Sequence, residues 1–435
     1  MYETFYHNLP NGVQIVHRLT SSPVVYVGIM IGAGTRHEQP EENGMAHYIE
    51  HCLFKGTEHY TARQIINHIE GIGGEINAYT TKEETTFYAA TLSNHFRTTL
   101  HLLADMVLRP TFNKKETDKE VTVILEEIES YNDSPSELIY DDFENMIFEG
   151  SSLALPILGT KKTLKRISKS PQYPLNWMAQ HYRHERMVLF VQGNVSTKQV
   201  ISAAEKELIA HSSQDVQYPI AAPAASISEA SLTHYPLSNS PQGVQYPIAA
   251  PAASNTRLYK RHTHQTHIML GSHSFPIGHP KQLTMFLLNN ILGGGSMSSR
   301  LYLSLREKYG LVYNIDSQAV PLSDTGYWDI YLACEPQHKD QCLELCHKEL
   351  QTLREVRLTS AQLQRALRQL EGQLAISAEN QENNALAMAK QMLYHHRAPQ
   401  WQETFAKVQK ITPEQLQEVA NEVFAPEKIY TLLYD

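Results

Sequence analysis

The pattern His47-Tyr48-Ile49-Glu50-His51 limits what this 435-residue chain can fold into and do more than any other feature of its sequence. On an α-helix the two histidines stand four residues apart and share one face, so both imidazoles can reach a single ion. Glu50 then lies beside that ion, where it can accept a proton from a water molecule. Two neutral imidazoles, an open coordination position and a nearby carboxylate are the parts of a hydrolytic zinc site. The pattern therefore predicts a metallohydrolase.

Such a site needs a third protein ligand, and the segment Glu116–Tyr131 supplies two candidates. Its apolar residues recur at helical spacing, at Val121, Ile124, Leu125 and Ile128. Glu120 and Glu127 are seven residues apart, which places them within about 20° of each other around a helix. Either carboxylate can complete the metal site. The alternative is a solvated acidic helix face that binds nothing.

The order H-x-x-E-H reverses the commoner H-E-x-x-H and is the established signature of the inverzincins. Together with the two glutamates, it makes the chain resemble the pitrilysin-type inverzincin metallopeptidases, and in length the subunits of mitochondrial processing peptidase and their bacterial relatives. Glu127 follows His51 by 76 residues, which is close to the interval at which that family places its third ligand. The resemblance implies one Zn²⁺ per chain, bound by His47, His51 and Glu127. It also implies Glu50 as the general base and Glu120 as the partner of a metal ligand.

The segment Gly73–Thr80, with the sequence GGEINAYT, resembles the edge strand to which this family binds an extended peptide. An edge strand has unpaired backbone N–H and C=O groups, so a peptide can add to it as a further strand. The resemblance implies Gly74, Asn77 and Ala78 as substrate-binding residues. Without the metal motif, an ordinary strand after a Gly-Gly turn would be the simpler interpretation.

The second half of the chain carries a separate group of candidate residues. Gly293-Gly294-Gly295-Ser296 precedes Arg306 and Tyr313, which are similar in type and spacing to an Arg/Tyr pair of the family. The resemblance implies that Tyr313 stabilises the oxyanion of the tetrahedral intermediate and that Arg306 holds the substrate backbone. It further implies substrate contacts at Gly294 and Gly295. The alternative is a flexible turn followed by an arginine stem on apolar surface and a half-buried tyrosine.

An internal similarity at an offset near 240 residues predicts two related units. Ile29-Met30-Ile31-Gly32 is matched by Ile268-Met269-Leu270-Gly271, and each half ends in a helix followed by a strand. We expect an α+β fold of two α/β-roll units, each an antiparallel-rich sheet with helices on one side, arranged as a clamshell, as the resemblance also implies. The expected units are residues 1–215, with the metal site, and residues 257–435. Residues 216–256 contain VQYPIAAPAAS twice and are expected to be an extended linker, with a proline-rich docking site as the alternative.

The net charge of −9 argues against nucleic acid or an anionic membrane as the main partner. The basic run at 161–169 is expected to be a solvated helix face. No segment approaches a membrane span, and residues 1–10 lack the apolar core of a signal peptide, so we expect a cytoplasmic location. The four cysteines are expected to be reduced thiols, with Cys52 facing the core, and not a disulfide framework or a second zinc site.

These features predict a zinc endopeptidase whose substrates are unfolded or extended peptides. In the expected reaction, Glu50 removes a proton from a zinc-bound water and returns it to the leaving amine. Because both groups of residues are encoded in one chain, we expect a homodimer, with a heterodimer of related chains as the alternative. The competing function is a non-catalytic or partner-dependent subunit of a related protease assembly, although such subunits commonly lack one of the two groups.

Overall fold

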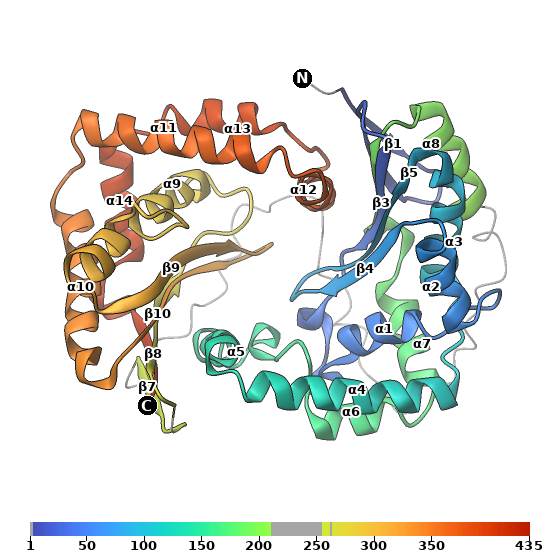
Figure 1. Ribbon diagram of the computed structural model, residues 1–435, viewed down its shortest axis with the longest axis horizontal. Coiled ribbons are helices and arrows are strands. Elements are labelled where there is room, and N and C mark those ends of the chain that lie inside the picture. Colours follow the sequence, from blue (N-terminus) through green and yellow to red (C-terminus); the bar gives the residue numbers. More distant parts are fainter. Residues whose placement is uncertain (1–2, 210–254, 262) are drawn as a thin grey trace, which may run out of the picture. The chain divides into compact units, whose positions relative to one another are not determined.

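The computed structural model describes residues 3–209, 255–261 and 263–435 of the chain. These residues form two compact units, each built on its own sheet (Figure 1). Residues 216–254 of the expected linker, which contain the duplicated segment, lie outside the described residues, so the linker stays a prediction there. Its last expected residue, Thr256, begins the strand Thr256–Tyr259. Within the described ranges, no helix combines the length and the apolar character needed to cross a bilayer.

The first unit contains a six-stranded mixed sheet in the order β1-β2-β6-β3-β5-β4. Its strands are β1 Thr4–Asn8, β2 Gln14–Leu19, β3 Val24–Ile31, β4 Glu75–Thr80, β5 Thr85–Leu92 and β6 Met187–Gly193. Only β2 and β6 run parallel, and all other neighbours run antiparallel. β4 lies at one end of the sheet and pairs with β5 alone among the described strands. The segment expected to be a strand is therefore an edge strand.

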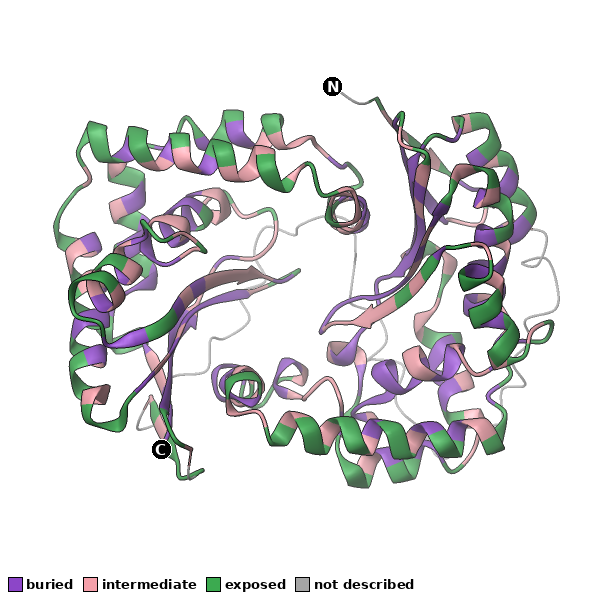
Figure 2. Cartoon of the chain, in the orientation of Figure 1, coloured by how far each residue is buried: buried purple, intermediate pink, exposed green. Residues whose placement is uncertain are grey.

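Helices cover both faces of this first sheet, and not one side alone as expected, because a helix from the C-terminal half packs on the second face. One face packs on α1 Met45–Leu53, α2 Ala62–Glu70, α3 Phe96–Leu108 and α8 Thr197–Ala204. The same core also includes residues of α4 Lys114–Asn132, α6 Lys161–Ile167 and α7 Gln172–His181. The other face packs on α12, Gln381–His395, from the C-terminal half of the chain. In β3, Ile29 and Ile31 belong to the first core and Met30 to the core beneath α12, as the two-residue period of a strand requires. The strands at the centre of the sheet are accordingly buried on both faces (Figure 2).

The second unit contains a five-stranded sheet in the order β7-β11-β8-β10-β9. Its strands are β7 Thr256–Tyr259, β8 Thr266–His273, β9 Val312–Pro321, β10 Gly326–Cys334 and β11 Tyr430–Tyr434. Its helices are α5 Pro135–Ile147, α9 Gln282–Leu292, α10 Lys339–Glu355, α11 Ser360–Ser377, α13 Trp401–Val408 and α14 Pro413–Val423. The order repeats β2-β6-β3-β5-β4 of the first sheet, and β7 and β11 form the same single parallel pair. This repeat of topology confirms the two related α+β units, whereas closure as a clamshell stays a prediction.

The two units are not continuous in sequence, and here the structure differs from the expected boundaries at 215 and 257. Residues 130–150, with α5, pack in the second unit, and residues 379–399, with α12, pack in the first. The apolar residues of α12, including Met388 and Met392, lie against the first sheet. The apolar spacing of such a helix shows that it covers a sheet, but it does not show which of two sheets is covered.

Candidate metal centre

The helix that carries the predicted motif, α1, is held at its N-terminus by Glu38. The Glu38 carboxylate accepts hydrogen bonds from the backbone N–H groups of Gly44 and Ala46, both at 2.8 Å, and from the Asn43 side chain at 3.1 Å. Burial raises the pKa of Glu38 to about 8, although these three donors oppose that shift. Sequence analysis missed Glu38 because a carboxylate six residues before Gly44 matches none of the usual capping patterns.

The opposite end of the site comes from α4, which packs on the same core as α1. Its buried residues are Thr117, Glu120 and Ile124, at spacings of three and four. Glu127, one turn further on, lies on the same face and remains 43% exposed. The apolar face of α4 therefore directs both predicted glutamates toward α1, as the helical wheel indicated.

Glu127, and not Glu120, converges with the two motif histidines. The Nε2 atoms of His47 and His51 are 3.2 Å apart, and Glu127 Oε2 lies 3.7 Å and 3.4 Å from them. Bonds of about 2.0–2.2 Å to a tetrahedral zinc ion place neighbouring ligand atoms about 3.3–3.5 Å apart. The three atoms therefore fit the corners of one coordination tetrahedron. His47, His51 and Glu127 also form the only such triad among the described residues.

The charges of these side chains suit a metal ligand set. Burial, together with the neighbouring His51 ring, lowers the pKa of His47 to about 4, so His47 is neutral near pH 7. Burial alone would lower the pKa of His51, but the carboxylates of Glu127 and Glu120 raise it above its ordinary value. The hydrogen bond from His51 lowers the pKa of Glu127 and keeps this side chain anionic. A divalent cation at this point would replace the proton that the cluster otherwise attracts.

Glu120 lies on the far side of the His51 ring. His51 Nδ1 is 2.8 Å from Glu120 Oε1, and Lys55 Nζ is 2.7 Å from Glu120 Oε2. An Nδ1–H group donating to this carboxylate leaves Nε2 as the lone-pair donor for a metal. Glu120 is only 6% exposed, and these two partners occupy one carboxylate oxygen each. This is the position that the implied role of Glu120 requires.

The Glu50 side chain extends from α1 to the end of β4. Its Oε2 accepts a hydrogen bond of 2.6 Å from the Thr80 hydroxyl, which leaves Oε1 free for a proton. Burial raises the pKa of Glu50, and the Thr80 bond opposes that shift. A raised pKa suits a general base, which works best with a pKa near the operating pH. Sequence analysis did not identify Thr80 as a partner of Glu50.

The Arg306 and Tyr313 pair lies in the second unit. Arg306 is on the short π-helical segment Tyr302–Lys308, and Tyr313 is on β9. The Arg306 guanidinium lies over the Tyr313 ring at 5.2 Å and over the Tyr302 ring at 4.8 Å. Tyr313 is 75% exposed, so it is not the half-buried tyrosine of the alternative interpretation. The approach of this pair to the metal residues stays a prediction.

The substrate-binding roles implied for the edge strand β4 and for the glycines at 74, 294 and 295 stay predictions. Gly74 precedes β4 and is closely packed, because a Cβ atom there would lie 2.6 Å from Thr91 Cγ2. On β4 itself, Asn77 is exposed and Ala78 is half-buried. Gly294 and Gly295 follow α9, and Gly295 has a positive φ of 35°.

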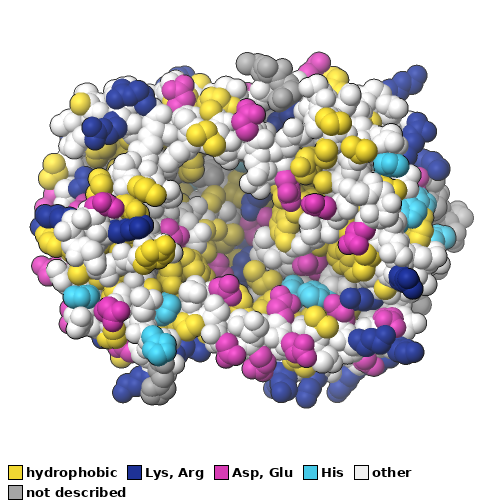
Figure 3. All heavy atoms as spheres, in the orientation of Figure 1, with side chains coloured by type: hydrophobic (Ala, Val, Ile, Leu, Met, Phe, Trp, Pro, Cys, Tyr) yellow, Lys and Arg dark blue, Asp and Glu magenta, His cyan; other side chains and the backbone are white. Residues whose placement is uncertain are grey.

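Two simpler expectations are confirmed. The lysine and arginine side chains of the basic run on α6 are exposed, and they gather along the lower edge of the molecule in Figure 3. All four cysteines are buried free thiols, and Cys52 points from α1 into the first hydrophobic core.

A helix-borne H-x-x-E-H motif with a carboxylate from a second helix is the centre of an inverzincin metallopeptidase. The chain belongs to peptidase family M16, the insulinase family. The family model described as "Insulinase (Peptidase family M16)" matches residues 14–161, and "Peptidase M16 inactive domain" matches residues 174–370. A Bacillus subtilis protein named "uncharacterized zinc protease YmxG" is 32% identical, over 97% of this chain and 96% of its own length. A Streptomyces coelicolor protein, also named an uncharacterized zinc protease, is 31% identical, over 95% of this chain and 86% of its own length.

Solved structures support the fold. A protease from Helicobacter pylori superposes with a TM-score of 0.83 at 19% identity, covering 100% of both chains. A Pseudomonas fluorescens structure described as a peptidase M16 inactive domain superposes with a TM-score of 0.82 at 19% identity, covering 99% of this chain and 97% of its own. The described residues therefore have the fold of M16 proteases in both units.

Proposed function

We propose that this chain is a zinc-dependent endopeptidase that cleaves unfolded or extended peptides. The observation that carries the proposal is the convergence of His47, His51 and Glu127, whose ligand atoms lie within 4.8 Å of one another. Glu50, one residue before His51, adds a carboxylate of raised pKa beside the same cluster. The relatives named zinc proteases match nearly the whole chain, and this supports the same chemistry.

The chain's own residues divide the proposed reaction among them. A bound Zn²⁺ supplies a Lewis acid that acidifies water and polarises a peptide carbonyl. His47 and His51 present Nε2 lone pairs, and Glu120 holds the His51 ring in the orientation that this requires. Glu50 accepts the proton of the attacking water at Oε1 and then delivers it to the nitrogen of the leaving amine.

The proposed substrate is an extended peptide because β4 is a free edge beside Glu50. A peptide added along β4 would form backbone hydrogen bonds, which a folded protein cannot offer without unfolding locally. Arg306 and Tyr313 belong to the proposal as groups that bind the substrate backbone and the oxyanion. Their participation would require the second unit to close over the first during each turnover. A homodimer is part of the same proposal.

Replacing Glu50 with glutamine tests the reaction. The amide keeps the shape of the side chain but cannot accept a proton, so zinc should stay bound while peptide hydrolysis falls about 10²–10⁴-fold. Glu126→Gln on α4 is the matched control, since Glu126 is exposed and lies outside the metal cluster. Bound zinc and cleavage of an unstructured peptide should be measured on the same samples. Retained turnover in zinc-loaded Glu50→Gln enzyme would rule out Glu50 as the base.

One observation favours a second candidate, a non-catalytic subunit of a related assembly. Residues 174–370 match a family model described as an inactive domain. The metal residues lie in the other match, at 14–161, so this description does not concern them. The second candidate predicts that the zinc-loaded chain alone cleaves no peptide and gains activity only with a related partner chain. The native mass and peptide digestion of the purified chain separate the two candidates.

A further inference from the structure

Glu50 is the proposed base, and the only side chain among the described residues that donates a hydrogen bond to its carboxylate is Thr80. We propose that Thr80 is a positioning residue for Glu50, and that α12 fixes Thr80 through the turn at residues 81–84. The inference rests on the proposed function, because it assigns a task to groups that act through the proposed base. It also means that α12, which is encoded in the C-terminal half but packs in the first unit, helps to position Glu50.

The strand geometry of β4 directs Thr80 toward α1. Side chains on a strand alternate between its two faces. Ile76 and Ala78 pack against the core that contains α1, and Thr80 continues their row. Tyr79 points to the other face, where its ring lies 6.5 Å from that of Tyr88. The Thr80 hydroxyl therefore reaches Glu50 only while β4 keeps its register with β5 and its distance from α1.

Thr80 is the last residue of β4, so the turn that follows sets its position. The Thr81 N–H donates to the Glu84 carbonyl at 2.8 Å, and the Glu84 N–H donates to the Thr81 hydroxyl at 3.1 Å. The backbone of Thr35 and Arg36 donates to the carbonyls of Thr81 and Lys82, at 3.2 Å and 2.8 Å. The turn is thus bonded within itself and to the segment before α1.

Gly34 lets the segment before α1 approach this turn closely. A Cβ atom at Gly34 would lie 2.4 Å from the Thr81 carbonyl oxygen and 2.7 Å from the Lys82 carbonyl carbon. On the same side of the turn, Lys82 donates from Nζ to the Leu155 carbonyl at 2.6 Å. One side of the turn is therefore held by the N-terminal half of the chain.

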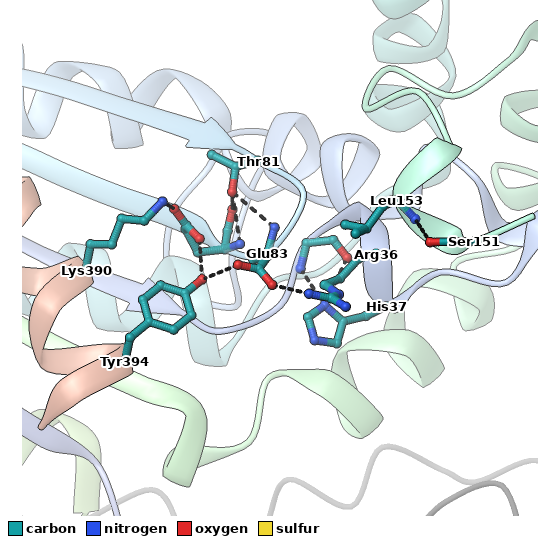
Figure 4. Close-up of polar contacts among 10 residues, drawn as sticks. Arg36, His37, Thr81, Glu83, Ser151, Leu153, Lys390 and Tyr394 are labelled. Atoms are coloured by element: carbon teal, nitrogen blue, oxygen red, sulfur yellow. Dashed lines mark hydrogen bonds and ion pairs between the residues drawn. The ribbon is translucent and has the colours of Figure 1, made fainter. Parts of the chain in front are cut away.

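The other side of the turn is held by α12. Lys390 Nζ lies 2.7 Å from Glu84 Oε1, and the Tyr394 hydroxyl donates to Glu84 Oε2 at 2.7 Å. The same hydroxyl is 3.3 Å from the Glu83 carboxylate, which also pairs with Arg36. Figure 4 shows Lys390 and Tyr394 reaching from α12 to the turn, with Arg36 on the opposite side of Glu83.

The carboxylates in these contacts are buried, although the Lys390 side chain is 44% exposed. Glu83 is 5% exposed and Glu84 is 1% exposed, and a buried carboxylate that loses its hydrogen-bond partners is destabilised unless it moves toward water. Loss of the α12 contacts therefore shifts the turn and, with it, the end of β4. The distance that matters most is the 2.6 Å between Thr80 and Glu50, since a base must lie within hydrogen-bond reach of the proton it accepts.

The first test replaces Thr80. Thr80→Val keeps the shape and the backbone bonds but removes the hydroxyl, so kcat on an unstructured peptide should fall about 10- to 100-fold, the range typical of a lost supporting contact. KM and zinc affinity should stay within about twofold, because neither the edge of β4 nor a metal ligand is altered. Thr80→Ser restores a hydroxyl and should recover most of kcat. An unchanged kcat in Thr80→Val enzyme would overturn the proposal.

The second test compares two tyrosines whose hydroxyls each join α12 to the N-terminal half of the chain. Tyr394→Phe removes the 2.7 Å bond to Glu84 at the turn, whereas Tyr88→Phe removes a 2.6 Å bond from β5 to Glu382 on α12, away from the turn. Each variant removes one tyrosine hydroxyl between α12 and the N-terminal half. The Tyr394 hydroxyl shares its single proton between Glu84 and Glu83, so the two losses of stability should be similar. Only Tyr394→Phe should lower kcat, by about 3- to 10-fold. Equal kcat values in the two variants would refute the role of α12.

A double mutant shows whether the two residues act through one route. If Tyr394 acts through Thr80, Tyr394→Phe should lower kcat no further once Thr80 is valine, so the two effects should not add. A crystal structure of each zinc-loaded variant is the readout that does not depend on activity. The Glu50 side chain should leave its position in Thr80→Val and keep it in Thr80→Ser and Tyr88→Phe. If Glu50 does not move in Thr80→Val, the positioning role is wrong, whether or not the proposed reaction is correct. Full turnover in Glu50→Gln enzyme would instead rule out Glu50 as the base, and a zinc-loaded wild-type chain that cleaves no peptide would refute the proposed function itself.

Discussion

The pair of bonds at Glu120 leads to a quantitative prediction about zinc affinity. Glu120→Ala removes the carboxylate that holds His51 Nδ1 at 2.8 Å and leaves Lys55 without its 2.7 Å partner. The His51 ring then becomes free to rotate and to place its proton on either nitrogen, so part of the population offers no Nε2 lone pair. Zinc binding must then fix the orientation and the tautomer of the His51 ring, which costs free energy, so the affinity for zinc should fall.

The expected loss follows from the geometry. A carboxylate behind a ligating histidine typically accounts for about 10- to 100-fold in metal affinity, which corresponds to about 1.4–2.7 kcal/mol. Glu120→Gln keeps an oxygen that can accept from Nδ1–H. A neutral acceptor is roughly half as strong as an ionised one, so this loss should stay within about tenfold. Lys55→Met removes the cation and leaves the Glu120 carboxylate for His51, so zinc affinity should hardly change.

The assay is competition for zinc between each variant and a chromogenic chelator at pH 7.5, with the free energy of unfolding of the metal-free proteins measured in parallel. The predicted order of zinc affinity is wild type and Lys55→Met together, then Glu120→Gln, then Glu120→Ala. If Glu120→Ala binds zinc within twofold of wild type, Glu120 does not support the ligand. If Lys55→Met weakens zinc as much as Glu120→Ala does, the effect is one of local packing and charge, and the orienting role is wrong.

Three further predictions concern the ligand, the helix cap and acid stability. Glu127→Ala should reduce zinc binding at least 100-fold while leaving the thermal unfolding of the metal-free protein nearly unchanged, because Glu127 is 43% exposed. Glu38→Ala should lower the free energy of unfolding by about 1–3 kcal/mol, since three buried donors lose their acceptor, whereas calorimetry of the exposed control Glu41→Ala should show little change. Burial lowers the pKa of His17 to about 4 and of His37 to about 3, so both rings bind protons more readily in the unfolded chain. The free energy of unfolding should therefore be largest above about pH 6.5 and should fall as the pH drops toward 4. A Tm that does not fall between pH 7 and pH 4, or that falls as steeply in His17→Gln, would contradict this account.

The parts of the structure that the sequence could predict are those with local causes. His47, Glu50 and His51 share a helix face because four residues make about one turn, and Glu120 and Glu127 share one because seven residues make about two. The repeat of the two sheets was visible because matching strands keep the same apolar runs. The choice of Glu127 as the converging carboxylate came from the family interval, since both glutamates are equally placed on a helical wheel and only the packing of α4 against α1 separates them.

The parts that the sequence could not predict depend on contacts between distant segments. Thr80 and Glu50 are 30 residues apart, and Tyr394 and Glu84 are 310 residues apart. No pattern along the chain records which strand end meets which helix face. Glu38 is a shorter-range case, since it caps α1 from a loop that folds back on the helix. Each of these residues is an ordinary polar residue in sequence and becomes a partner of the site only through the fold.

Because α12 packs on the first sheet, the unit that carries the metal residues cannot be formed by the N-terminal half of the chain alone. Val16, Met30, Val188 and Phe190 form an apolar sheet face that α12 buries almost completely. Residues 1–215 alone would expose that face to water, and exposed apolar area costs roughly 25 cal/mol per Å². They would also leave Glu84 buried without the Lys390 and Tyr394 contacts. The metal ligands come from the N-terminal half, yet the sheet that carries β4 is covered on both faces only with a helix that begins 188 residues after the end of β6 (381 − 193). The C-terminal half is therefore needed to build the first unit, independently of any contribution from Arg306 and Tyr313.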